Sequence, residues 1–191
     1  MRARAALLTK KIQCEVREIL LSKKPQQLFK VSPKGTVPVL ILPDGKVLEE
    51  SLDIMHWAMR EEKPLSEEAT SLIYKNDTEF KINLDKYKYS GRESEERKQD
   101  HRNLALIFLN ELEKKLQTSS FLFGDEMTFA DLAILPFVRQ FSLVEPEWFA
   151  ACGLQKMNIW LRNWLDAPLH AAIMQKYPLW SPDNASNVFL F

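Results

Sequence analysis

Residues 32–54 read SPKGTVPVLILPDGKVLEESLDI, and this stretch decides the fold class. The apolar, β-branched run Val37–Leu42 predicts a strand, and Lys46–Glu49 predicts the strand that returns beside it. Between them, Pro43-Asp44-Gly45 predicts a turn, because proline presets φ, aspartate bonds its own backbone and glycine accepts positive φ. A helix follows to about Arg60, with Ser51 as its expected N-cap.

The residues before this stretch alternate between helix and strand signals. Ala- and Leu-rich residues 1–10 predict a helix, Cys14–Leu20 alternates as a strand does, and Pro25–Lys30 predicts a short helix. The first 62 residues therefore read as a small α/β domain.

Glu61–Pro64 is the expected linker, because strand signals cease after it. Residues 66–191 read as an all-helical bundle, in which four-residue spacing predicts buried stripes. The expected buried residues are Ile73, Phe80, Leu84 and Tyr87 in one helix and Leu104, Phe108, Leu112 and Leu116 in the next.

Thr128 and Asp131 stand three residues apart before an apolar run, the pattern of a helix start with reciprocal capping. The helix that follows, Ala130–Phe141, is apolar on every side and belongs in the middle of a bundle, with a bend at Pro136.

The composition limits the kinds of partner that this chain is expected to bind. Lys plus Arg and Asp plus Glu both number 26, so the net charge is zero, which argues against nucleic acid as the main partner. The mixed-sign run Arg92–Arg102 is interpreted as a solvated helix face. No apolar run is long enough to span a membrane, so we expect no membrane partner.

The two cysteines, Cys14 and Cys152, lie far apart and form no metal-ligand spacing with the three histidines, so no metal is expected. Few cysteines and no signal-like stretch favour a cytoplasmic location. Cys14, on a strand with apolar flanks, is interpreted as a small core residue and not as a nucleophile. Four aromatic side chains either line a hydrophobic pocket or belong to the core: Tyr74, Tyr87, Tyr89 and Trp160.

The chain resembles the cytosolic glutathione transferases, most closely the bacterial members, over nearly its whole length. The resemblance rests on the loop 32–38, the Glu50-Ser51 pair that opens a helix, the segment 128–133 and the order of elements. It implies a thioredoxin-like domain over residues 1–62 and a helical domain over 66–191. It also implies glutathione as co-substrate, a small hydrophobic electrophile and a homodimer.

The resemblance assigns glutathione-binding roles to Val37, Pro38, Glu50, Ser51 and Lys34. Val37 would hold the cysteinyl backbone through its main chain, beside a cis bond to Pro38. Glu50 and Ser51 would hold the γ-glutamyl end at a helix N-terminus, which favours anions. The residues alone leave the other interpretations open: a trans proline that opens a strand, Ser51 as a plain N-cap with a solvated Glu50, and Lys34 as a solvated loop lysine.

In the resembled family, a first strand and a turn with a catalytic Ser or Cys precede the helix with which this chain begins. We therefore expect the catalytic group upstream of Met1, and we interpret Arg2 and Arg4 as surface residues. The slot of that first strand would be filled by an upstream segment, by the apolar tail 188–191 or a second subunit, or would remain a loosened gap.

The residues favour a glutathione transferase-like enzyme that moves glutathione to or from an electrophile, if an upstream Ser or Cys is present. A noncatalytic module of the same fold that binds proteins is the alternative, and a thiol reductase that uses Cys14 is disfavoured by the absence of a CxxC pair.

Overall fold

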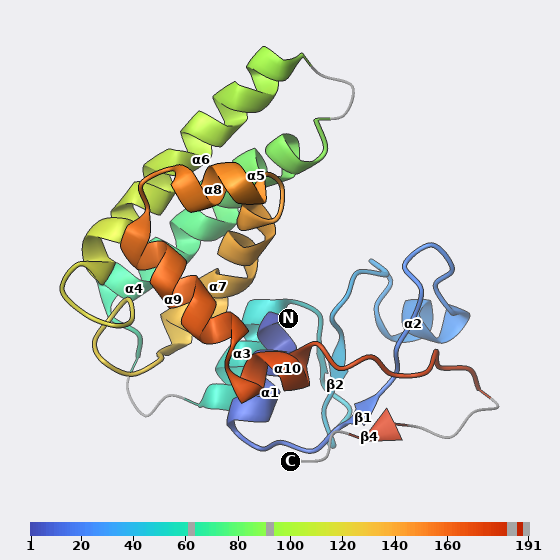
Figure 1. The fold of residues 1–191 in the computed structure, drawn as a ribbon. Coiled ribbons are helices and arrows are strands. Elements are labelled where there is room, and N and C mark those ends of the chain that lie inside the picture. The colour runs from blue at the N-terminus through green and yellow to red at the C-terminus, as the bar shows by residue number, and fades with distance from the viewer. Residues whose placement is uncertain (61–63, 91–93, 183–186, 189–191) are drawn as a thin grey trace. The chain divides into compact units, whose positions relative to one another are not determined.

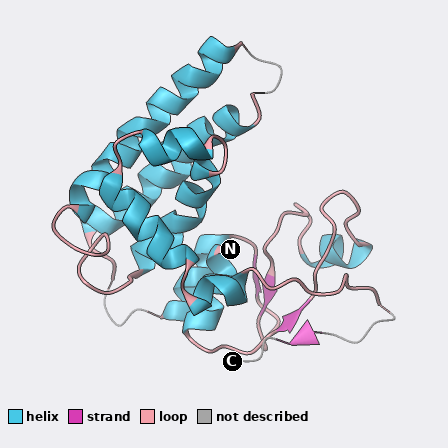
Figure 2. Cartoon of the chain, viewed as in Figure 1, coloured by secondary structure: helices cyan, strands magenta, loops and turns pink. Residues whose placement is uncertain are grey.

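The computed structural model describes residues 1–60, 64–90, 94–182 and 187–188 (Figure 1). The described chain forms two compact units, Met1–Glu62 with Pro168–Phe191 and Lys63–Ala167. The expected order of a mixed α/β half and a helical half is confirmed, and helix predominates over strand (Figure 2). The linker expected at Glu61–Pro64 lies mostly outside the described residues.

The first unit alternates helices and short strands. Its elements are α1 (Arg2–Thr9), β1 (Glu15–Val16), α2 (Gln26–Val31), β2 (Leu40–Ile41), β3 (Val47–Leu48), α3 (Ser51–Met59), α10 (Pro168–Ile173) and β4 (Asn187–Val188). Each predicted strand is present but shorter than expected, because only two residues of each run pair with a neighbouring strand.

The turn between β2 and β3 is formed as predicted. The strands pair antiparallel, with Leu40 opposite Leu48 and Ile41 opposite Val47. Gly45 has φ +86°, and the Asp44 carboxylate accepts a hydrogen bond from the Lys46 N–H at 3.0 Å. This local chemistry makes the chain reverse at residues 43–45.

The partner of β1 comes from the far end of the chain. β1 and β4 pair antiparallel, with Glu15 opposite Val188 and Val16 opposite Asn187. The N–H of Trp180 also donates to the carbonyl of Glu18 at 2.8 Å. Helix α10 and strand β4, which we expected in the helical domain, thus contact α1 and β1 of the α/β unit.

Helix α1 is the centre of the first unit and lies beside α3 and α10 (Figure 1). Its alanines allow close approach, and Ala3 belongs to a core cluster with Leu42, Leu48 and Ile54. The interpretation as a surface residue is wrong for Arg2, whereas Arg4 keeps 27% of its side chain exposed. Arg2 is only 5% exposed, and Arg4 donates to the Glu18 carboxylate and to the carbonyls of residues 173 and 175.

Among the described residues, all the regular elements of the second unit are helical. It contains α4 (Glu67–Lys75), the π-helical turn η1 (Asn76–Phe80), α5 (Lys81–Lys88), α6 (Glu95–Leu116), α7 (Phe129–Ser142), α8 (Pro146–Ala151) and α9 (Gln155–Leu165). Residues 66–89, expected as one helix, form one continuous helical run in which η1 joins α4 to α5.

Helix α7 is the buried helix that the sequence predicted. All residues from Phe129 to Pro136 are buried, and the capping box of Thr128 and Asp131 is present. The Asp131 carboxylate also accepts hydrogen bonds from the Leu122 N–H at 3.0 Å and the Trp160 indole N–H at 2.9 Å. One buried carboxylate thus connects α7 to a loop and to α9.

The predicted core stripe of α6 is confirmed except at its first position. Phe108, Leu112 and Leu116 are buried as expected, but Leu104 is 49% exposed and Ala105 takes its place in the core. The charged start of α6 also differs from the expected solvated face, because Lys98 and Arg102 both bind the Glu145 carboxylate, at 2.5 and 2.7 Å.

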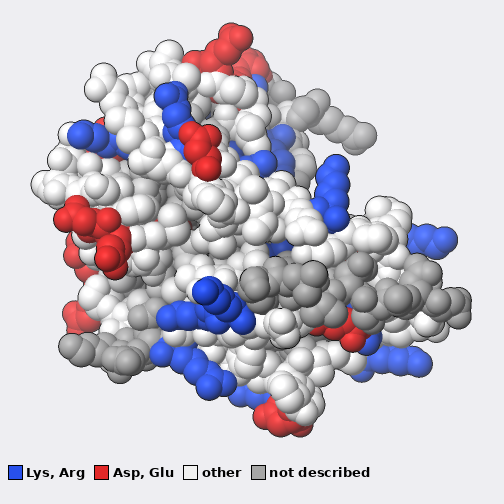
Figure 3. All heavy atoms as spheres, turned by 60° about the horizontal axis from the view of Figure 1, so that its bottom comes forward, with Lys and Arg blue, Asp and Glu red and all other residues white. Residues whose placement is uncertain are grey.

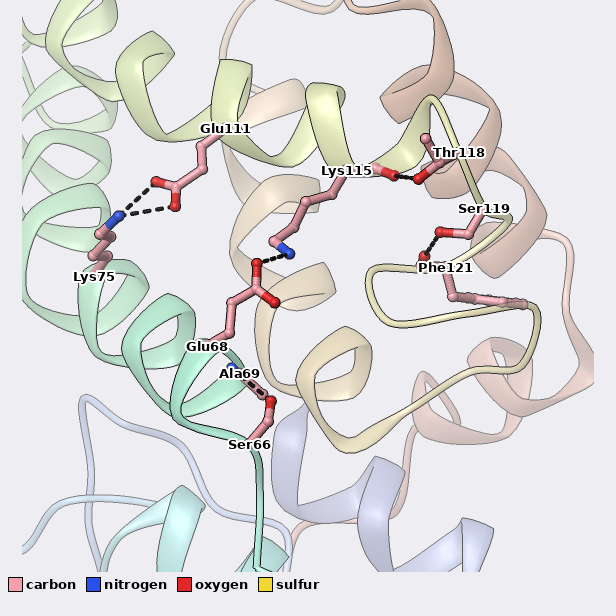
Figure 4. A network of polar contacts seen from close by, with 9 residues as sticks. All are labelled: Ser66, Glu68, Ala69, Lys75, Glu111, Lys115, Thr118, Ser119 and Phe121. Carbon is pink, nitrogen blue, oxygen red and sulfur yellow. Dashed lines mark hydrogen bonds and ion pairs between the residues drawn. The ribbon is translucent and has the colours of Figure 1, made fainter.

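Polar contacts connect α4 and α6 at their surface (Figure 4). The Lys75 ammonium donates to both oxygens of Glu111 at 2.8 and 2.9 Å, and Lys115 pairs with Glu68. Ser66 caps α4 by accepting the Ala69 N–H at 3.1 Å. No helix among the described residues is both long and apolar enough to cross a membrane.

Candidate functional site

Ser32 is buried and hydrogen-bonded at the start of the loop that precedes β2. Its side chain is fully buried, its N–H donates to the Leu28 carbonyl at 2.8 Å, and its carbonyl accepts the Gly35 N–H at 2.9 Å. The first contact ends α2 and the second closes a turn. The loop therefore leaves α2 in one defined direction.

Gly35 is required by the geometry of this turn. Its φ is +60°, and a Cβ at this position would lie 2.4 Å from the Phe29 ring. Both the left-handed backbone and the close ring exclude a side chain without rearrangement.

The loop then presents Val37 and Pro38 to solvent. The bond between them is cis, as predicted. Val37 is 45% exposed, and no hydrogen bond joins its main chain to another described residue. Exposed main-chain groups next to a strand can pair with an extended ligand.

Glu50 and Ser51 lie at the beginning of α3. The prediction that Ser51 is the N-cap is wrong by one residue: Glu50 has the N-cap conformation, with φ −105° and ψ 140°, and Ser51 is the first helical residue. Neither side chain caps the helix. The Ser51 hydroxyl and the N–H groups of the first turn are therefore available to a ligand.

One ion pair and one hydrogen bond connect the loop to the residues that precede α3. The Lys34 ammonium lies 3.6 Å from the Glu50 carboxylate, with 60% and 65% of the two side chains exposed. The Ser32 hydroxyl donates to the Glu49 carboxylate at 2.6 Å. The structure thus brings together Lys34 and Glu50, two residues that the sequence singled out.

Ser32 and Glu49 were not predicted as members of this site. Ser32 was quoted only as part of the loop, and Glu49 only as the end of a strand. No spacing in the sequence points to their hydrogen bond, because it joins residues 17 positions apart.

The cysteines do not resemble activated nucleophiles. Burial raises the pKa of the Cys14 thiol, and the nearby Arg4 opposes this only in part. Burial also raises the pKa of Cys152, whose thiol contacts the Phe149 carbonyl at 3.1 Å. Thiolate formation at either residue is therefore disfavoured.

The four aromatic candidates divide equally. Tyr87 and Trp160 are buried in the core of the helical unit, whereas Tyr74 and Tyr89 are exposed. The hydroxyl of Tyr87 donates to Glu145 at 2.6 Å, so this tyrosine is already engaged.

Charges of both signs occur on the face drawn in Figure 3, separated by uncharged atoms. Within the described part of the chain, no group of three or more His, Cys, Asp or Glu side chains could hold a metal ion. The site formed by residues 32–38 and 49–51 offers main-chain groups, the Lys34 cation and the carboxylates of Glu49 and Glu50.

Comparison with known proteins identifies close parallels. The family description "Glutathione S-transferase, N-terminal domain" matches residues 1–66, and "Glutathione S-transferase, C-terminal domain" matches residues 97–181. A protein of Nicotiana plumbaginifolia, "Probable glutathione S-transferase MSR-1", is 28% identical over 150 residues, which are 74% of this chain and 68% of the relative.

Two solved structures illustrate the shared fold. A glutathione transferase family member from Pseudomonas fluorescens, with two glutathione bound, has a TM-score of 0.76 at 17% identity and covers 90% of this chain and 86% of its own. A sphingomonad glutathione S-transferase complexed with glutathione has a TM-score of 0.75 at 18% identity and covers 91% of both chains. Both halves of the sequence thus match one family, and the chain belongs to the glutathione S-transferases.

Proposed function

We propose that the chain binds glutathione on Lys34, Val37 and Pro38 of the loop and on Glu50 and Ser51 at the start of α3. The observation that carries this proposal is the exposed main chain of Val37, which has no partner among the described residues. Solved relatives with bound glutathione add support.

Each end of the tripeptide has a chemical counterpart in the site. The N–H and carbonyl of Val37 pair with the main chain of the cysteinyl residue, and Pro38 shapes the loop beside it. Glu50 receives the ligand's ammonium, and Ser51 with the free N–H groups of α3 receives the adjacent carboxylate. Lys34 is the cation available for the carboxylate of the glycine end.

The Lys34–Glu50 ion pair does not prevent this arrangement. Both side chains are mostly exposed, and exposed pairs contribute about 0–1 kcal/mol. Glutathione carries both an ammonium and carboxylates, so each residue exchanges one charged partner for another on binding.

The proposed reaction is transfer of glutathione to or from a small hydrophobic electrophile. In the forward direction the thiol gives its proton to solvent, the thiolate sulfur attacks the electrophilic carbon, and the leaving group departs with its bonding electrons. The N-terminus of α1 favours an anion, so we propose that the thiolate is stabilised there. A Ser beside the thiolate favours conjugation, and a Cys favours thiol–disulfide exchange.

Titration calorimetry with glutathione tests the binding proposal. We expect binding by the unaltered chain, and weakening of about tenfold or more when Glu50→Ala and Ser51→Ala are combined, since 1.4 kcal/mol corresponds to a factor of ten. The matched control combines Ser66→Ala with Glu67→Ala at the start of α4, which should leave the affinity unchanged. Absent binding, or binding unaffected by the Glu50 and Ser51 changes, would refute the proposal and favour a noncatalytic protein-binding module.

We further propose a homodimer in the cytoplasm. Large apolar side chains are exposed on α4, α5 and α6, as interfaces require; these are Tyr74, Ile82, Leu104 and Ile107. Sedimentation at several concentrations tests the dimer, and a constant monomer mass would refute it. Both described cysteines are free, which agrees with a reducing compartment, and cell fractionation tests the location.

A further inference from the structure

Two adjacent acidic residues at the end of β3 serve different purposes. Glu50 points to solvent beside Lys34, whereas the half-buried Glu49 accepts the hydroxyl of the fully buried Ser32 at 2.6 Å. A short bond to a charged acceptor is stronger than a neutral one. Glu49 is thus connected to the loop, and Glu50 remains available.

All three polar groups of Ser32 are engaged. Its N–H ends α2 at Leu28, its carbonyl closes the turn at Gly35, and its hydroxyl contacts Glu49. The direction in which residues 34–38 leave this turn is therefore coupled to the position of Glu49.

The elements on either side of Glu49, β3 and α3, each place a residue in the core. Leu48, directly before Glu49, and Ile54, in the first turns of α3, are buried in one cluster with Leu42. Glu49 therefore lies between β3 and α3, which are both packed on the core. Its hydrogen bond with the Ser32 hydroxyl connects the loop to these packed elements.

We infer that Glu49, acting through the Ser32 hydroxyl, is a positioning residue that sets the loop 34–38 against the start of α3 for glutathione binding. This inference rests on the proposed function. The exposed Lys34–Glu50 pair cannot supply the same alignment, because it is solvated and its partners separate when the ligand binds. Holding both halves in place before binding reduces the entropic cost of association.

Charge-matched variants separate the hydrogen bond from the charge. Glu49→Ala and Glu49→Gln both remove one negative charge, but only glutamine retains an oxygen that can accept the Ser32 hydroxyl. We expect Glu49→Ala and Ser32→Ala each to weaken glutathione binding about fivefold, the equivalent of about 1 kcal/mol for one hydrogen bond. Glu49→Gln and Ser32→Thr should remain within about twofold of the unaltered chain.

The double variant Ser32→Ala with Glu49→Ala should bind about as weakly as either single variant, because all three lose the same contact. Amide hydrogen exchange of residues 34–37 without ligand gives a second readout, and it should accelerate in Ser32→Ala and Glu49→Ala only. Thermal unfolding and near-ultraviolet circular dichroism confirm that the variants are folded.

Equal weakening by Glu49→Gln and Glu49→Ala would show that the charge acts instead, and would overturn the inference. Unchanged binding in Ser32→Ala, or additive losses in the double variant, would also overturn it while leaving the proposed function intact. An unaltered chain that does not bind glutathione would refute the proposed function and this inference with it.

Discussion

Removal of the Asp131 carboxylate should destabilise the helical unit more than any other single truncation of a charged residue that we propose. Asp131 is fully buried at the start of α7. Its oxygens accept the Leu122 N–H, the Trp160 indole N–H, and both the N–H and hydroxyl of Thr128, at distances of 2.6 to 3.0 Å.

The magnitude follows from the donors that lose their acceptor in Asp131→Ala. The contacts with Leu122 and Trp160 are fully buried, so water cannot replace them, whereas Thr128 is partly exposed. Each buried orphaned donor costs about 1–3 kcal/mol, so the two together cost about 2–6 kcal/mol. The free energy of unfolding of a domain is about 5–15 kcal/mol, so this loss is a large part of the total stability.

Urea unfolding followed by tryptophan fluorescence measures this loss. The control is Asp125→Ala, which removes the same charge from an exposed position nearby and should change the free energy of unfolding by less than about 0.5 kcal/mol. Adding Trp160→Phe to Asp131→Ala removes one orphaned donor and should cost less than the two separate losses added together. A loss below about 1 kcal/mol for Asp131→Ala would show that these donors find other partners, and the reasoning would fail.

Three further perturbations test other parts of the structure. Gly35→Ala should lower the free energy of unfolding by about 1–2 kcal/mol, because φ is +60° there, and an unchanged value in urea unfolding would contradict the turn geometry. The pKa of Glu145 is lowered to about 2, first by the Lys98 hydrogen bond and then by the Tyr87 hydrogen bond. The stability that the Glu145 charge supplies is therefore present above the ordinary pKa of 4.5 and is lost as the pH falls toward 2. Glu145→Gln should therefore reduce the acid dependence of the urea midpoint between about pH 5 and 2, and an unaltered pH profile would speak against this network. Arg4→Lys cannot span Glu18 and the carbonyls of residues 173 and 175 together, so hydrogen exchange of residues 173–180 should accelerate. The exposed Arg162→Lys in α9 serves as control, and equal rates in both variants would refute the role.

Features whose cause lies within a few residues could be predicted from the sequence. The turn at residues 43–45 and the capping box of Thr128 and Asp131 are both confirmed, because their donors and acceptors are near neighbours. The remaining partners of Asp131 could not be predicted in this way. Trp160 lies 29 positions away, and only the packing of α9 brings its indole to the carboxylate.

Features that depend on tertiary burial were predicted less well. The stripe of α6 was placed on Leu104, although Ala105 is the buried residue, because a small residue fits where helices approach closely and carries little apolar signal. Arg2 and Arg4 were interpreted as surface residues in the absence of an adjacent thiol. The burial of Arg2 and the contacts of Arg4 follow from the packing of α1 against α3 and α10, which no local pattern reveals.

The candidate site could be predicted in part because one hairpin carries both halves of it. Leu40 pairs with Leu48 and Ile41 with Val47, and continuing this antiparallel register outward brings Pro38 level with Glu50 and Val37 level with Ser51. The turn at residues 43–45, itself visible in the sequence, sets this register. Two motifs twelve residues apart are thus expected to converge, and the 3.6 Å separation of Lys34 and Glu50 agrees with that expectation. The hydrogen bond between Ser32 and Glu49 lies beyond this reasoning, since Ser32 is positioned by the end of α2 and not by the hairpin. A register argument therefore locates the residues that face the ligand, whereas the residues that hold them in place require the tertiary structure.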